Sequence, residues 1–158
     1  YVQRLSQQKA AAVATQLDES AAILAADTVV ILASDATGII EDSEILGKPA
    51  NATQAKVMLQ RLRNRTHTVC TAFTILVTGD TSARHTEVVC TQVIMRDYSD
   101  TEIDTYIATG DPFDKAGSYA IQHEGFHPVA RIEGNYNNVV GLPIDEVQIA
   151  IENMHLSS

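Results

Sequence analysis

Positively charged residues are scarce in this chain of 158 residues. Lysine and arginine together number 11, against 20 aspartate and glutamate residues, which gives a net charge of −9. Nonspecific binding to nucleic acid or to anionic membranes requires a basic surface, so we expect neither as a partner. A small anionic substrate stays compatible with this composition, provided that a few lysines gather in one place.

Long apolar runs are also missing. No run is long enough to span a bilayer, and the N-terminal residues lack the pattern of a secretory signal. The two cysteines, Cys70 and Cys90, lie in apolar, β-branched runs without C-x-x-C spacing. We therefore expect a cytoplasmic protein whose cysteines are reduced core residues rather than a disulfide or a metal-binding pair.

Several catalytic motifs are missing as well. The chain has no Walker-type loop, no G-x-G-x-x-G and no G-x-S-x-G, which argues against P-loop enzymes, Rossmann dehydrogenases and acyl-enzyme hydrolases. Its five histidines form no H-E-x-x-H set. His123 and His127 are four residues apart, but Gly125 and Pro128 oppose the helix that such a metal pair needs.

The apolar pattern predicts a single α/β domain over residues 1–158, in which helices flank a mixed, twisted sheet. Hydrophobic residues make up 45% of the chain, enough for a full core. Apolar spacing predicts helices over residues 2–17 and about 51–64, and a last helix that begins near Pro143. Continuous β-branched runs predict a doubly buried strand over 21–32 and a hairpin of two long strands joined around residues 79–82.

Local signals refine this outline. Residues 35–38 are typical of a turn, followed by a short returning strand at 39–40. Ser99 and Glu102 have capping-box spacing and predict a short helix that ends at Gly110. Another strand is expected over 126–132. The polar stretch from Gly110 to Gly125 therefore falls in a turn-rich segment rather than in a helix or strand.

Two charged residues occupy apolar surroundings. Asp27 interrupts the predicted buried strand, where a carboxylate is costly unless it is paired, metal-bound or at a strand end facing a cleft. We favour a functional aspartate over a structural one. Lys9 projects from the apolar face of the first helix, and two interpretations stay open: its methylenes pack while its amine reaches water, or the amine points into a pocket.

Further polar groups stand apart from the packing pattern in Gly-Lys-Pro and in the turn-rich stretch. Lys48, Asp114 and Lys115 offer charges, and Gly117 permits close backbone approach. The amide of Gln122 suits the hydrogen-bonding edge of a planar ligand. Lysines neutralise phosphate oxygens, and a carboxylate can hold Mg²⁺ or orient an attacking water, so this set indicates phosphate chemistry.

Five stretches carry a resemblance to a known family: "AADTVV", "LGKP", "THTVCT", "GDPFDKAGSYAIQ" and "IEGNYNNVVGLP". Their order and approximate spacing resemble the Maf family of nucleotide pyrophosphatases, and "RLSQQKAAAVA" fits that family's Lys-Ala helix. The resemblance covers nearly the whole chain. It implies a fold like that of inosine triphosphate pyrophosphatases with a central cleft, hydrolysis of nucleoside triphosphates to monophosphate and pyrophosphate, a divalent metal (Mg²⁺ or Mn²⁺), and a homodimer.

The same resemblance implies roles for single residues. Asp27 is then the proton acceptor that activates water, close to the metal, and the lysines bind the triphosphate and stabilise developing charge. Thr28 and Gln122 influence which base is accepted. The catalytic candidates are thus Asp27, Lys48 and Lys115, the substrate-binding candidates are Lys9, Thr28 and Gln122, and the metal-binding candidate is Asp27.

Within the family, D-T-V-V together with D-K-A-G-x-Y-x-I-Q resembles the branch that acts on dTTP and UTP. Family members usually begin with a Leu-Ala-Ser strand and a Ser-x-Arg-Arg segment that contributes phosphate-binding arginines, and these 158 residues contain neither. Relative to the family we therefore expect an N-terminally truncated domain. The alternative function is a catalytically impaired nucleotide-binding or regulatory domain that lacks part of the triphosphate clamp.

Overall fold

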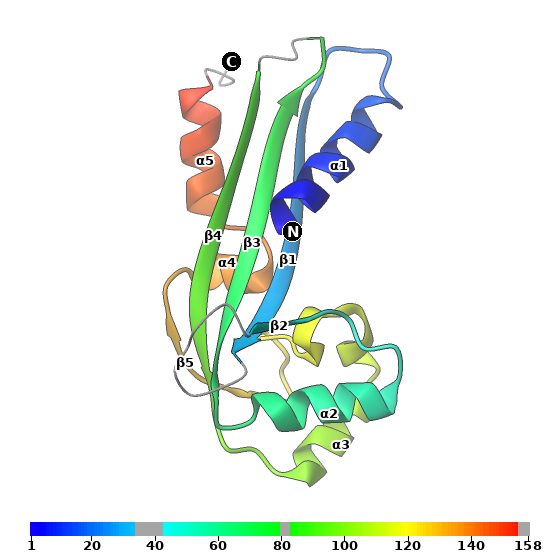
Figure 1. Cartoon of the computed structure of the whole chain (residues 1–158), viewed down its shortest axis with the longest axis vertical. Coiled ribbons are helices and arrows are strands. Elements are labelled where there is room, and N and C mark those ends of the chain that lie inside the picture. Colours follow the sequence, from blue (N-terminus) through cyan, green and yellow to red (C-terminus); the bar gives the residue numbers. More distant parts are fainter. Residues whose placement is uncertain (34–42, 80–82, 155–158) are drawn as a thin grey trace.

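The computed structural model describes residues 1–33, 43–79 and 83–154. Figure 1 shows its helices and strands. Their bounds in chain order are α1 (Val2–Ala14), β1 (Ala22–Ala33), β2 (Ser43–Leu46), α2 (Ala52–Leu62), β3 (Thr66–Val77), β4 (Arg84–Met95), α3 (Asp100–Ala108), the 3₁₀ turns η2 (Asp111–Asp114) and η3 (Ala116–Ser118), β5 (Val129–Glu133), α4 (Tyr136–Val140) and α5 (Ile144–Asn153). The predicted α/β class is confirmed.

The strands form one sheet in the order β2-β1-β3-β4-β5. We expected a mixed sheet, but every pairing between described strands is antiparallel. The reason is the position of α2, which lies at the end of the sheet where β1 finishes (Figure 1). The chain therefore enters β3 from that end and must run back alongside β1, whereas a parallel pair needs a crossover that returns to the start of the first strand.

Helices cover both faces of the long strands. Side chains alternate between the two faces of a strand. Accordingly, Cys70 and Ala72 of β3 pack with Val2 of α1 on one face, while Phe73 packs with Val147 of α5 on the other. Figure 1 shows α1 and α5 on either side of the upper half of the sheet. The prediction that β1 belongs to a covered sheet is thus confirmed.

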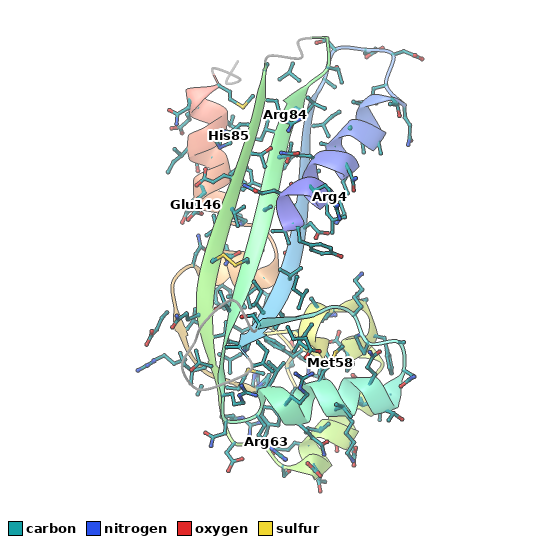
Figure 2. The ribbon with its side chains drawn as sticks, viewed as in Figure 1. Arg4, Met58, Arg63, Arg84, His85 and Glu146 are labelled. Atoms are coloured by element: carbon teal, nitrogen blue, oxygen red, sulfur yellow. A yellow bond between two sulfur atoms is a disulfide. The ribbon has the colours of Figure 1, made fainter. Side chains whose placement is uncertain are left out.

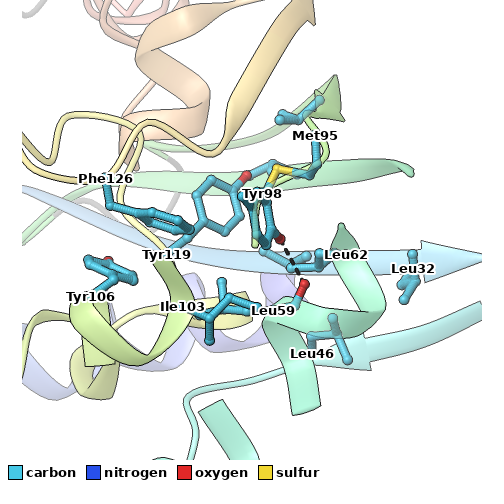
Figure 3. Packing of buried hydrophobic residues seen from close by; sticks show 13 residues of the cluster. Leu32, Leu46, Leu59, Leu62, Met95, Tyr98, Ile103, Tyr106, Tyr119 and Phe126 are labelled. Carbon is cyan, nitrogen blue, oxygen red and sulfur yellow. Dashed lines mark hydrogen bonds between the residues drawn. The ribbon is translucent and has the colours of Figure 1, made fainter. Parts of the chain in front are cut away.

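The largest core cluster lies at the opposite end, where α2 and α3 close the sheet. Figure 3 shows its aromatic centre: Tyr106 stacks on Phe126 with ring centroids 4.5 Å apart, and the buried Tyr98 hydroxyl donates to the Leu59 carbonyl at 2.7 Å. A buried tyrosine needs such a partner for its hydroxyl. Ala116 of η3 packs against this cluster, and η3 thereby lies beside β1 and α2.

Most local signals are confirmed. Asn51 caps α2 by accepting from the Gln54 amide at 2.9 Å, and Ser99 with Glu102 forms the complete capping box of α3. Gly110 has φ +81°, the left-handed conformation expected after a helix. The first helix ends at Ala14, earlier than expected. The turn at 35–38, the strand at 39–40 and the centre of the hairpin turn lie outside the described residues.

The prediction of two reduced cysteines is wrong. Cys70 and Cys90 are directly opposite each other in the β3–β4 register and form a disulfide, with Cα atoms 4.1 Å apart (Figure 2). Neighbouring antiparallel strands bring directly paired residues this close where the backbone does not hydrogen-bond between them. Cys70 is buried and Cys90 is exposed, so the bond runs from the α1 face of the core to the surface.

Among the described residues, no helix has both the length and the apolar character required to cross a bilayer.

Candidate active site

A cavity of about 520 Å³ opens beside β1. In the part of the chain that the structure describes, β2 pairs with β1 only over the residues from Val30 to Ala33, so the preceding stretch of this edge faces the cavity. The volume lies in the range of small-molecule binding sites. All six site residues expected from the sequence line it: Lys9, Asp27, Thr28, Lys48, Lys115 and Gln122.

Asp27 lies in the middle of β1 rather than at a strand end. Its Oδ1 accepts a hydrogen bond from Lys9 Nζ at 2.6 Å, and the same ammonium donates to the Ala26 carbonyl at 3.0 Å. The Asp27 side chain is 16% exposed and that of Lys9 is 54% exposed. Of the two interpretations of Lys9, the structure therefore supports the pocket-facing one. The ion pair with Lys9 also offsets the desolvation of a carboxylate within the sheet.

The neighbouring Thr28 is anchored from the other face of the sheet. Its Oγ1 lies 2.8 Å from Thr71 Oγ1, and Thr71 in turn donates to the Asn138 carbonyl at 3.0 Å. Because Thr71 uses its hydrogen in that bond, Thr28 is the donor of the pair. The buried Asn138 side chain donates to the Val69 carbonyl at 3.0 Å, which ties α4 to β3. This chain of contacts sets the orientation of a predicted specificity residue.

Lys115 sits in an acidic cluster. Its Nζ lies 2.7 Å from Asp114 Oδ1 and 3.0 Å from Asp111 Oδ1. Partial burial lowers the pKa of Lys115, but hydrogen bonds to Asp114 and then Asp111 outweigh burial and raise it. The ammonium is therefore fully charged at neutral pH. Asp111, four residues before Lys115, was not among the site residues expected from the sequence.

Gly117 joins the two sides of the cavity wall. It has φ +71°, and a Cβ at this position would lie 2.9 Å from Val30 Cγ2. Its amide donates to the Gly47 carbonyl at 3.1 Å, next to Lys48. The close backbone approach expected from the sequence is confirmed. It brings the segment that carries Lys115 against β1 and against the exit from β2.

The remaining predicted residues, Lys48 and Gln122, are exposed and lie on the cavity wall. Behind them the wall contains Tyr119, whose hydroxyl is 2.8 Å from Nε2 of the buried His67. Burial lowers the pKa of His67 to about 4, so the ring is neutral at physiological pH. This pair was not expected from the sequence, where His67 lies in an ordinary β-rich run.

The cavity offers a carboxylate rather than a preformed metal cage. The described part of the chain contains no group of three or more His, Cys, Asp or Glu side chains able to hold a metal ion. Asp27 and Asp114 are the carboxylates on the cavity wall. Magnesium is commonly held by one or two carboxylates together with substrate phosphates, so Asp27 fits an ion that arrives with a nucleotide. His123, which lies outside this wall, accepts a hydrogen bond from the Gly125 amide at its Nδ1, at 3.0 Å.

Comparison with known proteins decides the family. A family model described as Maf-like protein matches residues 1–154. The chain belongs to the Maf family. Three similar proteins are each named dTTP/UTP pyrophosphatase. The one from Citrifermentans bemidjiense is 45% identical over 151 residues, which is 96% of this chain and 72% of that protein. The one from Syntrophus aciditrophicus is 40% identical, over 98% of this chain and 70% of that protein. The one from Dictyoglomus turgidum is 46% identical, over 79% of this chain and 60% of that protein.

Proposed function

We propose that this Maf-family chain is a nucleoside triphosphate pyrophosphatase that hydrolyses dTTP and UTP to the monophosphate and pyrophosphate. The observation that carries the proposal is the meeting of Asp27 with three lysines, Lys9, Lys48 and Lys115, on the wall of one cavity. A carboxylate base among cations suits attack on a polyanion, because phosphoryl transfer depends chiefly on positioning and charge stabilisation.

In the reaction, Asp27 takes a proton from the attacking water. Lys9 holds one carboxylate oxygen, Oδ1, at 2.6 Å, and we assign the other oxygen to the water. As the water oxygen bonds to phosphorus, the P–O bond between the α and β phosphates breaks and pyrophosphate leaves. Lys48 and Lys115 neutralise charge on the phosphate oxygens.

We also propose that Asp27 holds Mg²⁺ or Mn²⁺ together with the triphosphate. The ion supplies charge neutralisation on the phosphate oxygens. A site completed by substrate agrees with the lack of a protein cage among the described residues. It predicts that the protein alone binds the metal weakly and that nucleotide and metal bind together.

For the base, we propose that Thr28 and Gln122 select a pyrimidine. Thr28 is fixed through Thr71, and Gln122 is an exposed residue of the cavity wall. Support for dTTP and UTP comes from the names of the similar proteins. Comparing UTP, dTTP, CTP and GTP as substrates tests this part of the proposal.

A homodimer is proposed from the family resemblance, and sedimentation in solution tests it. We place the protein in the cytoplasm with its nucleotide substrate, and we expect no nucleic-acid or membrane partner because of the net charge of −9. The Cys70–Cys90 disulfide argues against a cytoplasmic location, because such bonds are rare in the cytosol. Thiol labelling of the two cysteines in intact cells therefore tests the compartment.

The decisive experiment on the proposed reaction is product analysis. Purified protein is incubated with dTTP and Mg²⁺, and ³¹P NMR identifies the phosphorus products. Thymidine monophosphate with pyrophosphate supports the proposal, whereas orthophosphate with the diphosphate overturns it. Binding of dTTP without any turnover identifies instead the alternative, a nucleotide-binding or regulatory domain.

A further inference from the structure

On the cavity wall, the Lys115 ammonium contacts two carboxylates, Asp111 and Asp114. The two differ in their exposure to solvent and in whether a second side chain holds them. We infer that Asp111, held by Tyr106, permanently positions the Lys115 ammonium, while Asp114 is a temporary counter-ion that an incoming phosphate group replaces. The inference rests on the proposed role of Lys115 in binding the triphosphate.

Asp111 is a fixed partner. Its Oδ1 accepts from Lys115 Nζ at 3.0 Å, and its Oδ2 accepts from the Tyr106 hydroxyl at 2.8 Å. The Tyr106 ring is 1% exposed and stacks within the aromatic cluster of Figure 3. Lys115 also donates to the Asp111 backbone carbonyl at 3.1 Å. Both oxygens of the Asp111 carboxylate thus accept hydrogen bonds. One of the two donors is the hydroxyl of Tyr106, a side chain that cannot move without disturbing the core.

The Tyr106 hydroxyl has a second contact that matters for the same wall. It accepts from the Ala120 amide at 3.1 Å, two residues before Gln122. One buried hydroxyl therefore links the carboxylate behind Lys115 to the backbone that presents the proposed base-reading amide. Asp111 is accordingly a positioning residue that acts through Lys115 and does not itself meet the nucleotide.

Asp114 is the solvent-exposed partner of Lys115. Its side chain is 76% exposed, against 32% for Asp111, and its Oδ1 lies 2.7 Å from Lys115 Nζ. The pKa of Asp114 is lowered first by the hydrogen bond from Lys115 and, more weakly, by the charge of Lys48. An anionic oxygen thus lies within the field of two lysines proposed to bind phosphate. A phosphate oxygen can take this place while Asp114 turns into water at little cost, because exposed ion pairs are weak.

The two carboxylates can be tested by the same chemical change. Binding of a dTTP analogue with a non-hydrolysable α–β bridge, in the presence of Mg²⁺, is measured by calorimetry for the wild type, Asp111→Asn and Asp114→Asn. Asp104→Asn is the matched control, since Asp104 of α3 pairs with Lys56 of α2 and does not line the cavity.

The inference predicts changes of opposite sign. Asp114→Asn removes a competing anion and tightens binding by about two- to five-fold, the range of an exposed ion pair. Asp111→Asn weakens binding by about tenfold, because Lys115 and Tyr106 donate to different oxygens of Asp111 and the amide replaces one of these oxygens by an NH₂ donor. Asp104→Asn changes the affinity by less than about two-fold.

A simple charge effect would instead tighten binding in both Asp111→Asn and Asp114→Asn, and that result overturns the inference. Weaker binding by Asp114→Asn also overturns it, because Asp114 would then recruit the nucleotide or its metal. Tyr106→Phe serves as a second variant that keeps the ring: we expect weaker analogue binding together with a thermal midpoint that shows a folded protein. Unchanged binding by a folded Tyr106→Phe contradicts the positioning role.

The outcome is separable from the proposed function. If the wild type binds the analogue but releases no pyrophosphate from dTTP, the proposed function fails while the order of affinities still decides the inference. If the wild type does not bind the analogue at all, both are overturned. Where turnover is present, Asp111→Asn is expected to raise KM more than it lowers kcat, as for a group that orients a substrate-binding cation.

Discussion

Lys9 Nζ and Asp27 Oδ1 lie 2.6 Å apart, across the junction between the first helix and the middle of the first strand. The contact holds the proposed base in a defined orientation and places one cation beside it. It also shows how the sheet tolerates a carboxylate at this position. The two residues are 18 positions apart in the chain and belong to separate motifs, and this contact brings the two motifs together at one site.

Replacing Lys9 by Met tests this contact. The substitution removes the partner of Asp27 and one positive charge from the cavity wall, so we expect kcat/KM for dTTP to fall by about ten- to a hundred-fold. Steady-state kinetics measures the effect. Lys56→Met is the control, because Lys56 forms an exposed ion pair with Asp104 away from the cavity. Equal activity in the two variants would remove Lys9 from the site.

Gly117→Ala tests the close approach between η3 and β1. A Cβ at this glycine would lie 2.9 Å from Val30 Cγ2, and the residue has φ +71°. Strained backbone and overpacking together are expected to lower the free energy of unfolding by about 2–4 kcal/mol. Urea denaturation measures the loss. The matched control is Gly79→Ala. Gly79 has φ +87°, and among the described residues nothing beyond its chain neighbours lies within 4 Å of an added Cβ, so this variant should lose only about 1 kcal/mol. Equal losses would mean that the clash with Val30 is unimportant.

From the burial of His67 we predict that the free energy of unfolding depends on pH. Burial lowers its pKa to about 4 from an ordinary value of 6.5, so the unfolded chain binds a proton between these pH values while the folded chain does not. The free energy of unfolding therefore rises with pH across this window, and falls as the pH drops from 6.5 towards 4, by roughly 3 kcal/mol in total. Denaturation series at several pH values measure this slope.

His67→Gln should flatten that slope while keeping a group able to bond the Tyr119 hydroxyl. The control variant, His85→Gln, removes a histidine whose side chain is 39% exposed and should leave the slope as in the wild type. A wild-type slope that persists in His67→Gln would show that other groups cause it.

The disulfide predicts a redox-dependent stability. Cys70 and Cys90 are 20 positions apart, and a crosslink over a loop of this length stabilises by about 2–3 kcal/mol. Dithiothreitol should therefore lower the thermal midpoint of the wild type. Cys90→Ser, which changes an exposed residue, should begin with the lower midpoint and show no response to the reductant. A wild-type midpoint unaffected by full reduction would contradict this prediction.

Much of the site could be predicted because its residues break strong local patterns. Asp27 is a charge in an apolar strand, Lys9 lies on the apolar stripe of a helix, and Lys115 lies beside a glycine that allows close approach. In each case the local sequence alone shows that packing is not the whole explanation. The structure then brings all of them to one cavity.

What could not be predicted depends on contacts that form only when the elements pack together. The Tyr106–Asp111 contact requires the end of α3 to fold against η2, and nothing in the spacing marks it. Cys70 and Cys90 meet only in one register of the β3–β4 hairpin, whereas a shift of one residue would separate them. The sheet is antiparallel because α2 stays at one end of it, which the helix pattern does not reveal.

The most direct test of the account is the rate of pyrophosphate release from dTTP by Asp27→Asn, measured beside the wild type with Mg²⁺ present. The variant keeps the size of the side chain but loses the proton acceptor, so we expect kcat to fall by about 10²- to 10⁴-fold while the protein stays folded. A variant that releases pyrophosphate at the wild-type rate would contradict the assignment of Asp27 as the base.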